Sequence, residues 1–275
     1  FKLGGILAGK IDPTILPVLL GLYAFGIGKA ALMPFHRWLP AAMVAPTPVS
    51  ALLHAVAVVK AGVFTMLKVG VYIFGIDLLA VTQASDWLMA LATSLGVMGG
   101  AMHIAMHAMG KITLFMCAGA IYVATHKTEI SDMDGLGRIM PFTFGAFLIG
   151  ALSIIGLPPL GGAWSKWYLM LGAADAGHQI MIVVFMVSSL LNVAYLLPIV
   201  ARAFFVPAPR FASAGAAAVP VRGGIQEAPI LCVLPPVITA IGCLLLFFYA
   251  GEIYSLIYPV AFPDPSSAAV QSLAP

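Results

Sequence analysis

Charged residues and cysteines are scarce in this sequence. Asp, Glu, Lys and Arg make up 8% of the 275 residues, whereas a soluble domain has about 25%. This scarcity excludes an ordinary soluble globular protein. The net charge of +3 is small and spread over several loops, which gives no basis for nucleic-acid binding. Alternating apolar and polar stretches of about ten residues are also absent, which excludes a membrane β-barrel.

Each of the three cysteines lies inside an apolar run, without paired spacing: Cys117, Cys232 and Cys243. Such positions indicate small buried residues rather than disulfides or metal ligands. The sequence has no phosphate-binding loop, nucleophile triad or Cys/His metal motif. We therefore expect no cofactor, metal or catalytic residue in this chain, and whether it belongs to an enzyme stays open.

Hydrophobic residues make up 62% of the chain, and several apolar runs exceed the roughly 20 residues that a membrane helix needs. The sequence predicts an all-α polytopic membrane protein with about six transmembrane helices, two of them broken. The transmembrane domain is expected over residues 1–258, followed by a flexible tail, 259–275. The predicted spans are residues 14–45, 47–75, 101–125, 140–173, 178–206 and 229–258, with an interfacial segment at 77–100.

Prolines interrupt two of these spans in corresponding places. Pro34 breaks the first span, and the segment 156–162, Gly-Leu-Pro-Pro-Leu-Gly-Gly, breaks the fourth. Paired broken helices favour an inverted-repeat transporter with its site near the middle of the membrane. The loop at 126–139, which contains Asp134, is expected to be solvated and cytoplasmic, because basic residues gather on that side of the predicted spans.

Several ionisable side chains lie inside the apolar runs, among them Lys29, His54, Lys60, Lys111 and Lys166. A lysine in the hydrocarbon core costs roughly 2.5 to 3.5 kcal/mol on insertion scales, so such residues usually face a wet or protein-lined interior. Burial lowers the pKa of lysine, and histidine titrates near neutrality, so both can relay protons. The alternative is that the lysines extend to the lipid headgroups and the histidines only pack.

Three ionisable residues of the third span are spaced i, i+4 and i+8, which puts them on one stripe of the helix. They are His103, His107 and Lys111. His103 is the less certain proton-relay candidate of the two histidines, since it serves equally well as a packing residue. A haem between His103 and His107 is excluded, because haem ligands approach from opposite faces of the ring.

Three long motifs resemble one family. LMPFHRWLPAAMVAPTPVSALLHAVAVVKAGVF, MHIAMHAMGKITLFMCAGAI and DMDGLGRIMPFTFGAFLIGALSIIGLPPLGGAWSKWYL are similar to the antiporter-like membrane subunits of respiratory complex I, membrane-bound hydrogenases and Mrp-type cation/proton antiporters. The second motif and the ending SKWYL look most like the D subunit of the Mrp type. The resemblance covers residues 20 to 205.

The resemblance implies a proton-translocation role for specific residues. It matches Lys29 to the broken-helix lysine, His54 and Lys60 to the connecting relay, His107 and Lys111 to the central histidine and lysine, and Lys166 to the exit-side lysine. Members of the family also carry an earlier half, with a glutamate that pairs with the lysine at the Lys29 position. This chain is therefore expected to correspond to the later part of such a subunit.

The expected function is proton translocation, as proton/monovalent cation antiport, by one subunit of a multi-subunit complex. One alternative is a proton-pumping membrane subunit of an NADH-quinone oxidoreductase or hydrogenase complex, and another is a scaffold without transport. The implied partners are other membrane subunits, the lipid bilayer, protons and, for antiport, Na+. The implied location is a prokaryotic plasma (inner) membrane.

Overall fold

The computed structural model describes residues 6–7, 10, 15–16, 18–19, 22–23, 59–74, 93–127, 130–207 and 224–262. All regular structure in these ranges is helical, without strands, so the predicted all-α class is confirmed. Within the described part, three helices are long and apolar enough to cross a membrane: α7 (Ser94–Thr125), α10 (Gln179–Phe205) and α11 (Ile230–Phe248).

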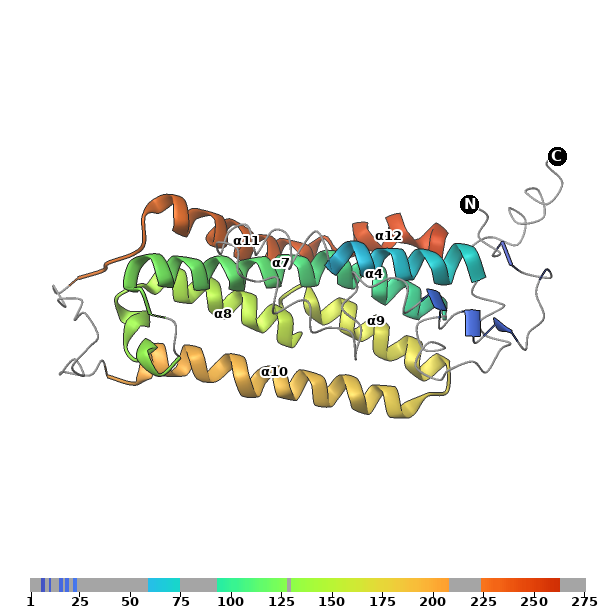
Figure 1. Ribbon diagram of the computed structural model, residues 1–275, viewed down its shortest axis with the longest axis horizontal. Helices are drawn as coiled ribbons and strands as arrows, with labels where there is room; N and C mark the ends of the chain where they lie inside the picture. Colours follow the sequence, from blue (N-terminus) through green and yellow to red (C-terminus); the bar gives the residue numbers. More distant parts are fainter. Residues whose placement is uncertain are drawn as a thin grey trace.

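The other helices are shorter. They are α4 (Val59–Lys68), the π-helical η4 (Val69–Phe74), the 3-10 turns η5 (Ile130–Met133) and η6 (Leu136–Arg138), α8 (Pro141–Ile155), α9 (Gly162–Asp175) and α12 (Ala250–Ala261). Figure 1 shows α8 and α9 following one another along a single line, as α11 and α12 do, with α10 running beside α8 and α9. The predicted span at 14–45 falls almost entirely outside the described residues.

Helix α7 begins earlier than the sequence predicts. The Thr93 side chain caps it by accepting a hydrogen bond from the backbone N–H of Gly96 at 3.0 Å, which satisfies one of the unpaired donors of a helix N-terminus. The predicted interfacial segment 77–100 is therefore wrong for residues 94–100, which are helical. Residues 77–92 lie outside the described part of the chain.

Helix α7 packs against α4, α8, α9, α11 and α12. It approaches α9 closely: a Cβ on Gly99 would lie 2.6 Å from the backbone N of Leu169, and one on Gly172 would lie 2.5 Å from the N of Gly96. Small residues allow such backbone contact between membrane helices. On another side, Thr113 of α7 and Thr239 of α11 share a hydrogen bond of 2.8 Å. These contacts make α7 the central helix of the described bundle.

The predicted interruption of the fourth span is present. Helix α8 starts with Pro141 in its first turn and ends at Gly156, whose φ of +90° lies in the left-handed region that favours glycine. The chain resumes as α9 at Gly162. The two halves of this span therefore end and begin inside the bundle, where their terminal backbone groups need partners.

The sixth predicted span, 229–258, is two helices rather than one. At Tyr249 the backbone (φ −89°, ψ 12°) departs from helical geometry between α11 and α12. Helix α12 packs on α7, and its Tyr254 ring lies 5.5 Å from the ring of Tyr168 on α9. Tertiary contact along α12 thus accompanies a helix break at Tyr249 that continuous hydrophobicity does not predict.

Polar contacts close the end of the bundle near η5 and η6. Glu227, just before α11, accepts hydrogen bonds from the N–H of Phe142 at 2.7 Å and from the Thr143 hydroxyl at 2.6 Å, so it caps the N-terminus of α8. Arg202 of α10 forms an ion pair with Asp134 at 2.8 Å. Asp134 lies in the predicted loop; its side chain is 17% exposed and is held in this ion pair.

Acidification is expected to weaken the contact between Asp134 and Arg202. The hydrogen bond from the Arg202 guanidinium holds the pKa of the Asp134 carboxyl below its ordinary value. Such a group stabilises the fold above its unfolded pKa of about 3.9, and this contribution is lost as pH falls through the lower folded value. We expect the apparent melting temperature in detergent to fall more steeply below about pH 4 than it does for Asp134→Asn. Equal pH slopes for the two proteins would contradict this assignment.

Candidate functional site

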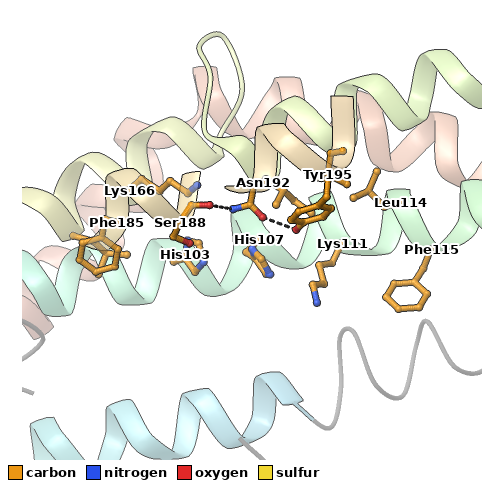
Figure 2. A pocket seen from close by; sticks show the side chains of 13 residues that line it. His103, His107, Lys111, Leu114, Phe115, Lys166, Phe185, Ser188, Asn192 and Tyr195 are labelled. Atoms are coloured by element: carbon orange, nitrogen blue, oxygen red, sulfur yellow. Dashed lines mark hydrogen bonds between the residues drawn. The ribbon is translucent and has the colours of Figure 1, made fainter. Parts of the chain in front are cut away.

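A cavity of about 510 Å³ lies between α7, α9 and α10. Four residues singled out from the sequence line it: His103, His107, Lys111 and Lys166. The rest of its polar wall comes from α10, through Ser188, Asn192 and Tyr195. Figure 2 shows these side chains together, with the α7 residues following one another along their helix. The cavity therefore gathers basic and neutral polar groups inside an otherwise apolar bundle.

The stripe predicted on α7 is present. The His103 and His107 rings lie 4.8 Å apart between centroids, tilted by 32°, and Lys111 follows one turn later on the same wall. Both histidines are partly buried, whereas the Lys111 side chain is exposed. Successive titratable groups at one-turn intervals form a row along which a proton can be passed through the cavity.

Lys166 stabilises the break between α8 and α9. Its Nζ donates hydrogen bonds of 2.8 Å to the backbone carbonyl of Ile155, in the last turn of α8, and to Ser189 Oγ on α10. A cation is favoured at a helix C-terminus, where the carbonyl groups carry partial negative charge. Gly156 makes this reach possible, because a Cβ there would lie 2.8 Å from Lys166 Cδ. The broken helix thus supplies the ammonium group with part of its counter-charge.

Ser165, the residue before Lys166, is fully buried and joins α9 to α7. Its hydroxyl oxygen lies 3.0 Å from His103 Nδ1 and 3.1 Å from the carbonyl oxygen of Gly162. The ring of His103 is thereby held in one orientation against the start of α9. Nothing in the sequence distinguishes Ser165 from other small residues of the apolar helices.

Helix α10 adds a polar face that the sequence analysis also missed. Asn192 Nδ2 donates to the backbone carbonyl of Ser188 at 2.9 Å, and the Tyr195 hydroxyl donates to Asn192 Oδ1, as the dashed lines in Figure 2 mark. Ser188, Asn192 and Tyr195 are spaced i, i+4 and i+7 in an apolar run, and this spacing is the sequence signal that could have predicted one polar face. These groups form a chain of hydrogen bonds along the cavity wall and can also bind water.

The side chains of the remaining predicted site residues lie outside the described part of the chain. Lys29 and His54 lie outside the described residues. The backbone of Lys60 belongs to α4, which packs against α7, but its side chain is outside the described part. Their place on the axis stays a prediction.

The electrostatics of the cavity constrain its chemistry. Among its described lining residues none is acidic, so His103, His107, Lys111 and Lys166 face one another without a carboxylate in this set. Within the described residues, no group of three His, Cys, Asp or Glu side chains is placed to hold a metal ion.

The sequence matches the family described as NADH:quinone oxidoreductase/Mrp antiporter, transmembrane, over residues 8–90 and 80–192. It is 29% identical to NADH-quinone oxidoreductase subunit N of Desulforudis audaxviator over 94% of this chain and 60% of the relative. It is 32% identical to subunit L of Rickettsia bellii over 72% of this chain and 36% of the relative. The chain thus spans between about a third and three fifths of the length of these relatives.

Solved membrane complexes share the fold. A chain of the Mrp complex from a Dietzia species aligns with a TM-score of 0.75 and 19% identity, over 98% of this chain and 63% of that chain. A chain of respiratory complex I from Thermus thermophilus aligns with a TM-score of 0.63 and 24% identity, over 90% of this chain and 61% of that chain. At these identities the likeness shows the fold, an integral multi-pass helical membrane protein.

Proposed function

Because the chain belongs to the NADH:quinone oxidoreductase/Mrp antiporter transmembrane family, we propose that it translocates protons as one membrane subunit of a larger complex. The path runs through the cavity between α7, α9 and α10. The observation that supports it most is the gathering of His103, His107, Lys111 and Lys166 on one cavity. Ionisable groups inside membrane helices are costly and usually mark ion pathways.

The path works by changing which basic group is charged. The His103 and His107 rings lie 4.8 Å apart on adjacent turns, so a proton can move along α7 to Lys111. Lys166 lines the same cavity, and its Nζ donates hydrogen bonds to the Ile155 carbonyl and to Ser189. When a proton arrives on a neighbouring group, repulsion between the two positive charges favours release from one of them. The predicted residues Lys29, His54 and Lys60 extend this axis.

Proton exchange for a monovalent cation such as Na+ is the form of transport that we place first. The resemblance of MHIAMHAMGKITLF to the Mrp D subunit and the Mrp-type structural neighbour support it. On this proposal the chain lies in a prokaryotic inner membrane, among other membrane subunits and lipid.

A second candidate is the pumping arm of a redox-driven complex. The curated relatives named above are NADH-quinone oxidoreductase subunits, and a respiratory complex I chain shares the fold. Co-purification with iron–sulfur subunits would favour this candidate, whereas co-purification with only small membrane subunits favours antiport. A complex that forms but moves no protons would instead support the scaffold alternative.

Replacing Lys166 by methionine tests the proposed function. Methionine keeps much of the side-chain volume, but it has no ionisable proton and cannot donate hydrogen bonds to Ile155 and Ser189. We expect proton flux in proteoliposomes of the intact complex to fall about a hundredfold, the size of a typical general acid–base contribution. Lys127→Ala is the control. It also removes a lysine that donates to a backbone carbonyl, that of Asp132, but Lys127 lies in the loop after α7 and does not line the cavity.

The variant and control are to be compared at equal amounts of assembled complex, quantified by size-exclusion chromatography. Flux of Lys127→Ala should match the wild-type value. Wild-type flux in Lys166→Met would remove Lys166 from the path.

A further inference from the structure

Ser165 occupies a position that a packing role alone does not explain. It is fully buried, it lies one turn into α9, and it is the sequence neighbour of Lys166. Its hydroxyl oxygen has two polar neighbours: the carbonyl oxygen of Gly162 at 3.1 Å and Nδ1 of His103 at 3.0 Å. The first neighbour belongs to its own helix and the second to α7.

The proton inventory of these three groups restricts how they can bond. A carbonyl oxygen only accepts, and a serine hydroxyl has one proton and two lone pairs. When Ser165 donates to Gly162, its oxygen is left to accept from an N–H on His103 Nδ1. When His103 is charged, both ring nitrogens carry protons. Nδ1–H then again donates to Ser165, and Ser165 again donates to the Gly162 carbonyl.

We propose that Ser165 is a positioning residue that keeps a proton on Nδ1 of His103, so that Nε2 is the nitrogen that takes up and releases protons on the path. The inference rests on the proposed function, since it names the ring nitrogen of His103 that exchanges protons in that relay. Both charge states of His103 then use one geometry of Ser165 and Gly162. A proton can arrive and leave without any rearrangement of the α7–α9 contact.

The start of α9 is built to hold this geometry. Gly162 lies directly against the carbonyl group of Ser153 on α8, with no room for a Cβ. Lys166, the residue after Ser165, donates hydrogen bonds to the Ile155 carbonyl and to Ser189. The carbonyl that accepts from Ser165 is thus fixed between two helices. On α7, the His103 ring is also held by its contact with the His107 ring, 4.8 Å away.

Nitrogen-15 NMR of the intact complex, labelled at histidine, tests the proposal. The two neutral tautomers of histidine have distinct ring-nitrogen shifts, and His103→Gln identifies the signals of His103 by their loss. We expect the Nδ1–H tautomer in the wild-type protein at a pH where the ring is neutral. The Nε2–H tautomer there would overturn the proposal.

Ser165→Ala removes the acceptor and is expected to shift His103 toward the Nε2–H tautomer, which is the one that an imidazole side chain prefers in water. Ser189→Ala is the matched control, because it removes a hydroxyl bonded to Lys166 and leaves the contact of Ser165 with His103 in place. Ser165→Thr restores a hydroxyl at the same position. An unchanged tautomer in Ser165→Ala would overturn the proposal whatever the stability of the variant.

Flux measurements separate this inference from the proposed function. Ser165→Ala is expected to lower proton flux about tenfold, the low end of the range for losing a partner that orients a metal-binding histidine, and Ser165→Thr is expected to recover most of it. Because the tautomer is read without transport, a complex that moves no protons can still show the Nδ1–H form. A tautomer change in Ser165→Ala with wild-type flux would overturn the role of His103 Nε2 in the path.

Discussion

Lys111→Ala is expected to reduce proton flux through the intact complex about a hundredfold, in line with the loss of a positioned proton-transfer group. Lys111 is the last basic group of the α7 stripe and lines the cavity with His103 and His107. Alanine keeps the helix, because it has the highest helix propensity, but it leaves a gap in the row of proton carriers. The measurement is acidification of proteoliposomes, followed with an entrapped pH-sensitive dye.

Two features make this substitution informative. The Lys111 side chain is exposed in this structure, so its removal leaves little packing defect and assembly should persist. Thr113, two residues later, bonds to Thr239 of α11 on another side of α7. Thr113→Val therefore serves as a matched control, which should affect stability more than flux. If Thr113→Val and Lys111→Ala reduced flux equally, the loss would reflect damage to α7 rather than a missing proton carrier.

Gly162→Ala is expected to have the largest effect on stability. A Cβ on Gly162 would overlap the carbonyl oxygen of Ser153, and a backbone atom of α8 cannot move aside as a flexible side chain can. Overpacking of this kind costs about 1 to 3 kcal/mol, occasionally more. The start of α9 would have to shift, carrying Ser165 and Lys166 away from their partners. We expect a lower yield of assembled complex and a lower apparent melting temperature in detergent.

Gly145→Ala provides the matched control for this substitution. Gly145 is in the middle of α8, and nothing lies within 4 Å of the position that its Cβ would take. The same change there should be neutral or stabilising by up to about 1 kcal/mol, the difference in helix propensity between alanine and glycine. A Gly162→Ala protein as stable as Gly145→Ala would show that the α8–α9 contact is not tight.

Residues that are costly in their surroundings are visible in the sequence, whereas their role in proton transfer stays a prediction. His103, His107 and Lys111 stand out as ionisable groups at helical spacing in an apolar run, and the structure places them on one cavity. Lys166 stands out in the same way, shortly after the Gly-Leu-Pro-Pro-Leu-Gly-Gly segment that follows the end of α8 at Ile155. A charged group inside a membrane helix requires compensation, and this requirement makes it visible in the sequence.

Neutral polar residues carried no comparable signal. Three of the polar residues have uncharged side chains: Ser165, Asn192 and Tyr195. A hydrogen bond between membrane helices contributes only about 0.6 kcal/mol on average to stability, so such residues do not stand out in the sequence as a buried charge does. Their importance lies in which neighbours they meet across α7, α9 and α10. That depends on tertiary packing, which one sequence does not specify.

Two errors in the predicted helix boundaries have physical causes. The Gly99-Gly100 pair was interpreted as part of an interfacial segment, but Gly99 lies inside α7 at its close approach to Leu169. Glycine there serves packing between helices rather than interruption of one. The break at Tyr249 has no glycine or proline at the position itself, so hydrophobicity alone predicted a continuous span.

The claim that matters most is that the basic side chains of α7 and α9 conduct protons through the membrane. It is tested most directly by loading proteoliposomes of the intact complex with Na+, diluting them into Na+-free buffer with equal potassium and valinomycin to hold the membrane potential at zero, and recording proton uptake in exchange for Na+. Wild-type complex should take up protons faster than protein-free vesicles, and Lys111→Ala complex should not. Equal uptake by wild-type and Lys111→Ala complexes would contradict a proton path along this cavity.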